Sequence, residues 1–235
     1  MVARGLAESR EKAQRLIMAG EVRVGGVPAA KPAQPVAPGA VIEVEAPPRF
    51  VSRGGEKLDA AFGAFPISVD GVVCLDIGAS TGGFTDCMLQ RGAARVYAID
   101  VGRGQLHWKL RTDPRVVVME GINARHLQAL RVPEPAGFAA MDVSFISLTK
   151  VLPAVRELLL PGAGLVTLIK PQFEAGRAEV GRGGVVRDEA VRERVVEAVR
   201  SFGVSELGLE WRGVCPSPLR GPAGNVEFLA CWRRP

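Results

Sequence analysis

The stretch "LDIGASTGGFTD", residues 75–86, is the strongest indication of the fold of this chain. In it an apolar run ends in an acidic residue, and a loop of small residues follows. Glycine has no side chain, so such a loop lets a ligand approach the backbone closely. Similar short apolar runs recur downstream, separated by helical or loop segments: "RVYAID", "RVVVME", "FAAMD", "GLVTLIK" and "NVEFLACW". This alternation predicts an α/β fold with a mainly parallel sheet covered by helices on both faces.

Charged side chains stand at or near the ends of these runs, where an open parallel sheet binds its ligands. They are Asp76, Asp100, Glu120, Asp142 and Lys170. Asp100 follows Asp76 at about the spacing at which an acidic residue binds ribose hydroxyls. All five are therefore expected to line one crevice at the same edge of the sheet.

The chemistry of the loop argues against a dinucleotide as the ligand. A pyrophosphate site needs G-x-G-x-x-G at a helix N-terminus, whereas "DIGASTGGF" places an acidic residue before G-x-S-x-G-G. A carboxylate repels pyrophosphate but can orient the ammonium group of an amino-acid ligand. S-adenosylmethionine carries that ammonium and a sulfonium and no phosphate. The loop therefore predicts a Rossmann-like, class I methyltransferase; a tight strand–helix turn without ligand is the alternative.

A second, smaller part precedes this sheet. Ser9 can cap a helix that ends near Gly20, "EVRVGGV" is expected to form a strand that enters a glycine turn, and "AVIEVE" a further strand. Six prolines interrupt residues 28–48. The expected organisation is a small α+β domain over 1–45, a linker over 46–55 and the methyltransferase domain over 56–235.

Basic side chains gather in the small domain, on a chain whose net charge is +5. They are Arg4, Arg10, Lys12, Arg15 and Arg23. Positive charge on a rigid helix and hairpin favours a phosphate-contacting surface, because it releases counterions from RNA. A solvated helix–hairpin that binds nothing is the alternative.

Four side chains could carry out the transfer. "MDVSF", residues 141–145, stands where amino-methylating enzymes carry [N/D]-P-P-[Y/F/W], and it lacks that motif. The chain offers two lysines and two carboxylates instead: Lys57, Asp142, Lys170 and Glu227. This set suits a hydroxyl substrate such as a ribose 2′-OH, which needs a well-placed base.

A lysine acts as a base only in its neutral form, which a second ammonium nearby favours. We therefore predict Lys170 as the base, with Asp142 and Lys57 positioning it and Glu227 holding the network or the ribose. A solvated lysine at a strand end and a glutamate that caps a strand are the alternative interpretation.

Two resemblances support these expectations. "RGLAESREKAQRLIMAGEVRVGG" resembles an S4 RNA-binding domain, although only the last residues of the usual first helix, of the type RLDxxLxxR, are present. The resemblance implies an N-terminally incomplete S4-like domain. "SRGGEKL", "DIGASTGGFTD", "DVSFISL", "IKPQFE", "GGVVRD" and "SPLRGPAGNVEF" resemble the TlyA, or haemolysin A, family of ribosomal RNA 2′-O-methyltransferases, whose catalytic part is FtsJ-like.

That family resemblance implies methylation of cytidine 2′-hydroxyls in ribosomal RNA, with ribosomal RNA or ribosomal subunits as partners. It also implies that a Lys-Asp-Lys-Glu tetrad maps onto Lys57, Asp142, Lys170 and Glu227. The S-adenosylmethionine positions that it implies are Asp76, Gly78, Ser80, Gly82, Gly83, Phe84 and Asp100, with Glu120 and Asn123 near the adenine.

Two further segments could contact RNA. "EAGRAEVGRGGVVRD" carries Arg177, Arg182 and Arg187 among glycines and is interpreted as a basic lid over the RNA backbone; a mobile surface loop is the alternative. Trp108 could stack on the adenine or on a splayed base, or belong to the core.

Bulk properties set the remaining expectations. Cys74, Cys87, Cys215 and Cys231 form no CxxC pair, so neither a metal site nor a disulfide is expected. The chain shows no membrane-spanning run and no signal-peptide core, and a reducing cytoplasm is the expected compartment. The rival functions are a membrane-active haemolysin, a non-catalytic RNA-binding protein and a base methyltransferase.

Overall fold

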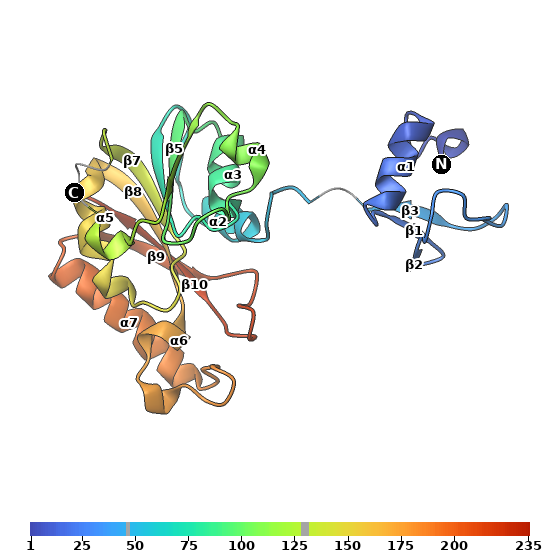
Figure 1. Cartoon of the computed structure of the whole chain (residues 1–235). Helices are drawn as coiled ribbons and strands as arrows, with labels where there is room; N and C mark the ends of the chain where they lie inside the picture. The colour runs from blue at the N-terminus through green and yellow to red at the C-terminus, as the bar shows by residue number, and fades with distance from the viewer. Residues whose placement is uncertain (46–47, 128–131) are drawn as a thin grey trace. The chain divides into compact units, whose positions relative to one another are not determined.

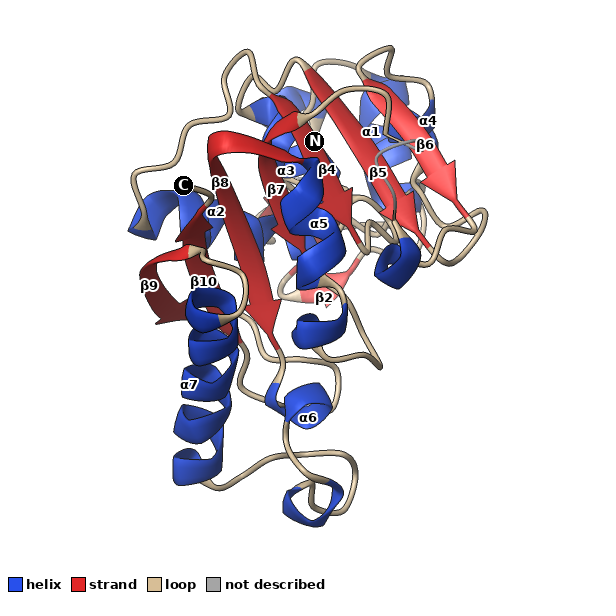
Figure 2. Ribbon diagram, turned by 90° about the vertical axis from the view of Figure 1, so that its left-hand side faces the viewer, coloured by secondary structure: helices blue, strands red, loops and turns tan. Residues whose placement is uncertain are grey.

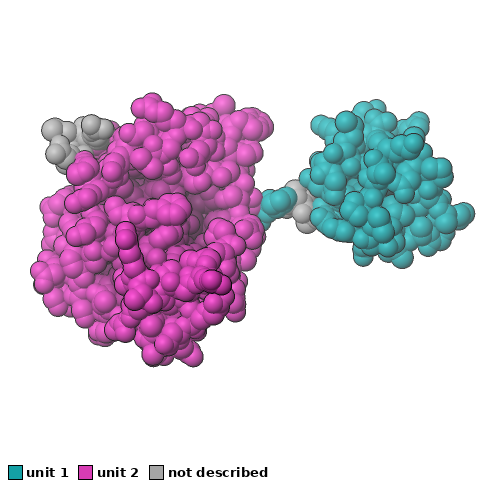
Figure 3. All heavy atoms as spheres, turned by 60° about the horizontal axis from the view of Figure 1, so that its bottom comes forward, with its two compact units in different colours: residues 1–49 teal, residues 50–235 magenta. Residues whose placement is uncertain are grey.

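The computed structural model describes residues 1–45, 48–127 and 132–235, which form two compact units (Figure 3). The first unit is Met1–Arg49 and the second is Phe50–Pro235. Of the expected linker, residues 46–47 lie outside the described residues, and residues 50–55 belong to the second unit. Phe50 is buried, with its ring in the space that a side chain at Gly55 would need. Phe50 also belongs to the apolar cluster that includes Met88, a long-range contact that the composition of the stretch does not reveal.

The first unit contains one α-helix and a small sheet (Figure 1). After the 3-10 helix η1 (Val2–Arg4), α1 spans Arg10–Met18, and Ser9 Oγ accepts the Lys12 N–H at 3.1 Å, as expected of its cap. The antiparallel sheet has the order β2-β1-β3, with β1 at Val22–Val24, β2 at Val27–Pro28 and β3 at Ile42–Val44. Gly25 and Gly26, both at positive φ, make the predicted turn.

The second unit is built on one seven-stranded sheet of order β6-β5-β4-β7-β8-β10-β9 (Figure 1). The strands β4 to β8 are parallel to one another, and β10 runs antiparallel to both β8 and β9. Their bounds are Val73–Ile77 (β4), Arg95–Asp100 (β5), Val116–Glu120 (β6), Ala136–Met141 (β7), Leu159–Ile169 (β8), Glu210–Pro216 (β9) and Phe228–Arg233 (β10). Every predicted strand is present, and β9 is an additional edge strand.

Helices cover both faces of this sheet, as the alternating pattern predicts. On one face lie α2 (Gly54–Ala64), α3 (Gly83–Gln90) and α4 (Trp108–Arg111), which contribute Leu58, Met88 and Leu110 to one apolar cluster. On the other lie α5 (Leu152–Leu158), which Figure 2 shows in front of the strands, and α7 (Glu189–Ser205). Short helices complete the unit: η2 (Ala124–His126), η4 (Leu148–Lys150), α6 (Pro171–Glu174) and η5 (Arg177–Glu179).

The helix α7 contains a glycine in its last turn. A glycine at the end of a helical pattern commonly marks the helix terminus, but α7 continues to Ser205 with Gly203 buried inside it. A Cβ at Gly203 would overlap the indole of Trp232, a buried residue of β10. Gly203 is therefore a packing glycine, because the indole takes the place of a side chain.

The cysteines behave as buried thiols. Cys74, Cys87 and Cys231 are buried, and none of the four cysteines, all of which lie in the described ranges, forms a disulfide. Burial raises the pKa of Cys74 to about 12 and that of Cys231 to about 11, which keeps both protonated at neutral pH. Within the described ranges, no three or more His, Cys, Asp or Glu side chains are grouped as a metal site requires. None of the described helices has both the length and the apolar character to cross a bilayer.

Candidate active site

The loop of residues 78–82 joins β4 to α3 at the carboxyl edge of the sheet, and two clefts flank it. The first, of about 450 Å³, is lined among others by Lys57 and Asp142. The second, of about 570 Å³, is lined by Asp100 and by the apolar side chain of Ile122. The residues that belong to both walls are Gly78, Ser80 and Asp142. One continuous ligand could therefore extend from one cleft into the other across the loop.

Two glycines allow close backbone contacts that shape these clefts. Gly78 has φ +86°, and a Cβ there would overlap the main chain of Asp142, just after β7. A Cβ at Gly83 would lie 2.7 Å from the Gly55 nitrogen and 3.0 Å from the Gly54 Cα. The first turns of α2 and α3 thus touch through their paired glycines. This contact helps to place Lys57, further along α2, on the cleft wall.

Asp76 and Asp100 have different surroundings although both lie near the end of a strand. Asp76 is fully buried, and its Oδ2 accepts the Thr85 N–H at 2.8 Å and the Thr85 hydroxyl at 2.6 Å. Asp76 therefore links β4 to α3, and it is not among the described residues that line the two clefts. Asp100 lines the second cleft and accepts the N–H groups of Ser80 and Gly102 at 2.8 and 2.6 Å.

Burial raises the pKa of Asp76 to about 7; the Thr85 hydrogen bonds oppose this shift, and the charges of Asp142 and Asp100 add to it. A carboxyl with a raised native pKa binds more protons when folded, so its contribution to stability is lost as pH rises from about 4 to about 7. We predict that Asp76→Asn gains stability relative to the wild type across this window, by at most roughly 1.4 kcal/mol per pH unit. Urea denaturation at both ends of the window measures the difference.

The matched control for this prediction is Asp70→Asn, because the Asp70 side chain is exposed and should show no such trend. A constant difference in unfolding free energy between Asp76→Asn and the wild type at the two pH values would contradict the prediction.

The remaining loop and adenine candidates divide into two groups. Those that line a cleft are Gly78, Ser80, Gly83 and Phe84 in the first and Asn123 in the second. A Cβ at Gly82 would overlap the side chains of Leu106 and Leu110, so the small size of Gly82 serves packing. Glu120 stands outside both walls as the described residues define them and pairs with Arg111.

The two lysines and two carboxylates form two close pairs. Lys57 Nζ lies 2.6 Å from Glu227 Oε2, and the Glu227 side chain is only 1% exposed. Lys170 Nζ lies 2.5 Å from Asp142 Oδ1 and donates to Ser144 Oγ at 2.8 Å. Lys57 and Asp142 line the same cleft, so each pair contributes one side chain to its wall.

The antiparallel strand β10 explains how Glu227 reaches this edge. Phe228, the first residue of β10, pairs with Ile169, the last residue of β8. Glu227 and Lys170 flank that pair, one just before β10 and the other just after β8. The reversed direction of β10 thus brings its start to the carboxyl edge of the parallel strands.

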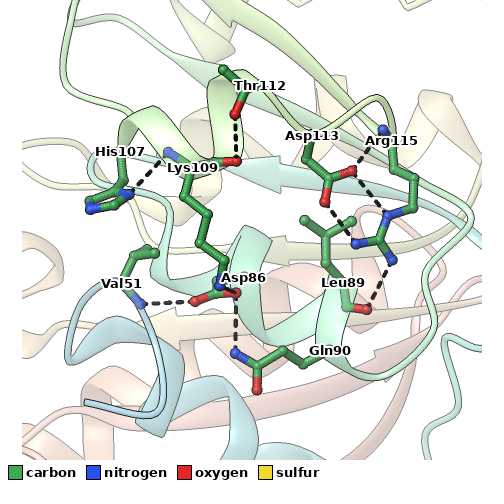
Figure 4. Close-up of polar contacts among 9 residues, drawn as sticks. All are labelled: Val51, Asp86, Leu89, Gln90, His107, Lys109, Thr112, Asp113 and Arg115. Carbon is green, nitrogen blue, oxygen red and sulfur yellow. Dashed lines mark hydrogen bonds and ion pairs between the residues drawn. The ribbon is translucent and has the colours of Figure 1, made fainter. Parts of the chain in front are cut away.

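The segment that enters the second unit is held by a buried carboxylate. Asp86 of α3 accepts the Val51 N–H at 2.9 Å and the Gln90 amide at 3.1 Å, and Lys109 Nζ lies 3.5 Å away. Figure 4 shows Val51 and Lys109 approaching this carboxylate from two different segments. Residues 52–54 follow directly and line the first cleft. Asp86 therefore holds the segment that precedes α2 in place.

The structure adds side chains at this edge that sequence reasoning missed. Phe145 has φ +63° and is 91% exposed, and its ring centroid lies 5.1 Å from that of Phe173. Glu174 holds the loop that follows, because it accepts the Ser147 hydroxyl and the Leu148 N–H at 2.6 and 2.7 Å. The position of Phe145, an aromatic residue close to the end of a predicted strand, could have identified it from the sequence. The contacts of Glu174 with Ser147 and Leu148 depend on tertiary packing and could not.

The basic residues expected to contact RNA are not equally available. Arg4 donates to the carbonyls of Pro38 and Ala40, and Arg23 pairs with Glu45, so both hold the first unit together. The exposed members are Arg10, Lys12 and Arg15 on α1, and Arg177, Arg182 and Arg187 in the glycine-rich segment. Trp108 is 72% exposed and therefore does not belong to the core.

The wall of the second cleft fits a cationic ligand that has an apolar ring and no phosphate. Two carboxylates, Asp100 and Asp142, line it, and Asp142 Oδ1 is buried without a hydrogen-bond donor in suitable geometry among the described residues, although Lys170 faces it. Ile122 and Val151 give the second cleft an apolar side. These features fit S-adenosylmethionine better than a pyrophosphate.

Comparison with known proteins identifies the family. The FtsJ-like methyltransferase family matches residues 50–234, and the S4 domain family matches residues 1–42. The chain is 50% identical to the 16S/23S rRNA (cytidine-2′-O)-methyltransferase TlyA of Mycobacterium tuberculosis, over 100% of this chain and 87% of that protein. It is 46% identical to Hemolysin A of Brachyspira hyodysenteriae, over 96% of this chain and 94% of that protein.

A solved structure supports the same assignment. The hemolysin-like protein of Streptococcus thermophilus is 45% identical and superposes with a TM-score of 0.79, over 97% of this chain and 84% of that chain. The predicted fold class, a Rossmann-like methyltransferase unit preceded by an S4 domain, is confirmed by these matches and by the sheet order. The chain therefore belongs to the TlyA, or haemolysin A, family, in which an S4 domain precedes an FtsJ-like methyltransferase domain.

Proposed function

We propose that this protein transfers the methyl group of S-adenosylmethionine to the 2′-hydroxyl of a cytidine in ribosomal RNA. The observation that supports it most is the pair geometry at the first cleft. Lys57 and Asp142 face the same space, each bound to an opposite charge, Glu227 and Lys170. The name of the Mycobacterium tuberculosis relative supplies the nucleotide and the RNA class.

The cofactor would lie across the glycine loop. Asp100 at the second cleft can accept hydrogen bonds from ribose hydroxyls, and Asn123 and the apolar side of that cleft suit the adenine. The small residues of the loop, Gly78 and Ser80, would lie against the methionine part. When bound, S-adenosylmethionine supplies a methyl group that its sulfonium already activates.

The protein then has to align the acceptor and take its proton. In the proposed step Lys170 Nζ, in its neutral form, would take the proton of the 2′-hydroxyl. S-adenosylmethionine would supply the methyl group to the acceptor oxygen and would itself become S-adenosylhomocysteine. Asp142 and Ser144 hold Lys170 in place, and the Lys57–Glu227 pair orients the ribose from the opposite side of the tetrad.

Labelled S-adenosylmethionine and purified ribosomal subunits test this function. We expect label in ribosomal RNA, and nucleoside mass spectrometry should locate it on the ribose of cytidine. Label on a base would refute the ribose assignment, and the absence of label from RNA would refute the proposed activity. The cytoplasm, where ribosomes are found, is the proposed compartment.

The first unit would bring the RNA to the second. Three side chains on α1 carry exposed positive charge, Arg10, Lys12 and Arg15. We predict that replacing all three with alanine lowers RNA affinity and reduces the salt dependence of binding, by about 0.7 in slope for each phosphate that is no longer neutralised. Fluorescence anisotropy at several salt concentrations measures both quantities.

The affinity for S-adenosylmethionine, measured by calorimetry, serves as the control and should stay within about twofold of the wild type, because the clefts lie in the second unit. An unchanged salt slope would show that α1 does not contact phosphates.

A further inference from the structure

The loop between β9 and β10 is a rigid support beside the proposed tetrad. Ser217 Oγ donates to the Leu219 carbonyl at 2.9 Å, and Gly221 N–H donates to the Asn225 carbonyl at 2.9 Å. The Ser217 N–H reaches the Glu227 carbonyl at 2.8 Å and closes the loop at its base. These hydrogen bonds leave the loop little freedom to rearrange.

Asn225 anchors this loop to a second segment. It is 2% exposed, its Oδ1 accepts the Val186 N–H at 3.0 Å, and its Nδ2 donates to the Gly184 carbonyl at 2.8 Å. The loop also packs directly on the tetrad, because a Cβ at Gly221 would lie 2.6 Å from Glu227 Oε1. The loop and the Glu227 carboxylate are therefore held as one assembly.

Arg220 precedes Gly221 and projects from this support. It is exposed and lines the first cleft, the one that also contains Lys57 and Asp142. Arg53, which precedes α2, is exposed and lines the same cleft. Neither guanidinium has a hydrogen-bond or ion-pair partner in the part of the chain that the structure describes. Two uncompensated positive charges, carried by different segments, thus stand at the edge of the space where the acceptor would bind.

We propose that Arg220 binds a backbone phosphate of the RNA next to the acceptor ribose. This inference rests on the proposed function and names a substrate contact for it. A guanidinium matches the geometry of a phosphate, with two parallel N–H donors for its oxygens. A phosphate adjoins every ribose 2′-hydroxyl within an RNA strand, so an acceptor ribose at the tetrad brings an anion to the cleft edge. The rigid loop reduces the conformational entropy that Arg220 loses on binding.

Such a contact positions the strand and carries no base preference. Arg220 is therefore a residue that determines where the ribose sits relative to the tetrad. Its loss should raise the KM for RNA and leave the chemical step largely intact. Arg53 would contribute a second contact from the segment before α2, which Asp86 holds.

The test uses the full-length protein and two probes. In the binding arm, a short single-stranded oligoribonucleotide is titrated at several salt concentrations against the wild type, Arg220→Ala and Arg220→Glu. We expect Arg220→Ala to reduce the salt slope by about 0.7 and to weaken RNA binding about tenfold, with Arg220→Glu weaker still. In the activity arm, with ribosomal subunits, Arg220→Ala should raise KM by a similar factor and change kcat by less than about threefold.

The control variant is Arg233→Ala. Arg233 is also exposed, and it lines a different cleft together with Gly137 and Gly164. Gly137 lies near the start of β7, and Gly164 lies near the start of the part of β8 that pairs with β7. Arg233 is therefore at the opposite edge of the sheet and should match the wild type in both arms. The affinity for S-adenosylmethionine, measured by calorimetry, should be unchanged in every variant, within about twofold.

Two results would overturn the proposal. In one, Arg220→Ala keeps the wild-type salt slope and the wild-type RNA affinity. In the other, it loses affinity for S-adenosylmethionine with an unchanged RNA slope, which would assign Arg220 to the carboxylate of the cofactor. Failure of the proposed function looks different: the wild type would transfer no methyl group, while the binding arm would still measure the contribution of Arg220.

Discussion

Replacement of Lys170 with methionine is expected to reduce methyl transfer by about 10²–10⁴-fold, the range that a general base contributes. Methionine retains the apolar stem and removes the amine that would take the proton of the 2′-hydroxyl. Lys170 is 8% exposed, and its amine is held by Asp142 and Ser144, so a solvent molecule is a poorly placed substitute for it. Single-turnover transfer to ribosomal subunits measures the loss.

Cofactor binding separates this chemical role from a structural one. Lys170 is not among the described residues that line the second cleft, where the adenine and ribose of the cofactor would lie, so Lys170→Met should bind S-adenosylmethionine within about threefold of the wild type by calorimetry. Lys150→Met, which replaces an exposed lysine of η4, is the matched control and should keep full activity. If Lys170→Met retains wild-type turnover, the assignment of Lys170 as the base is wrong.

The second large effect is expected on stability, from the pair Lys57–Glu227. The Glu227 side chain is 1% exposed and Lys57 Nζ lies 2.6 Å from it, so this carboxylate is balanced by one largely buried partner. Lys57→Met leaves the carboxylate buried without that cation. We expect the unfolding free energy to fall by about 3–5 kcal/mol, because an uncompensated buried charge is costly. Urea denaturation at neutral pH measures it.

A double variant tests whether the cost comes from the stranded charge. Lys57→Met with Glu227→Gln removes both charges and should recover most of the stability that Lys57→Met loses, although methyl transfer should stay low in both. Arg95→Met, which breaks an exposed pair with Glu134, should cost less than about 1 kcal/mol. A double variant as unstable as Lys57→Met alone would show that the packing of the lysine stem, and not the charge, is responsible.

Features that depend on local pattern could be predicted from the amino-acid sequence. Apolar runs of strand length predicted β4, β5, β6, β7, β8 and β10, and Ser9 predicted the start of α1. Strand-end charges could be placed at one edge because parallel strands with crossover helices all point the same way. For this reason Asp142 and Lys170 were expected together, and the structure places them 2.5 Å apart.

Contacts between segments that are distant in the chain became evident only in the folded structure. The side chain of Glu227 meets that of Lys57 because β10 runs antiparallel beside β8, and no local pattern specifies the direction of a strand. The same limit applies to Asp76, whose hydrogen bonds go to Thr85, and to Glu120, which pairs with Arg111.

Glycines show the difference most clearly. Gly82 was expected to contact the ligand, and Gly203 stands where a glycine commonly ends a helix, but leucine side chains and the Trp232 indole occupy the space beside them. A glycine in the sequence shows only that a side chain is absent. Whether a ligand, a turn or a neighbouring side chain occupies that space depends on packing across the whole domain, and this packing exists only in the folded structure.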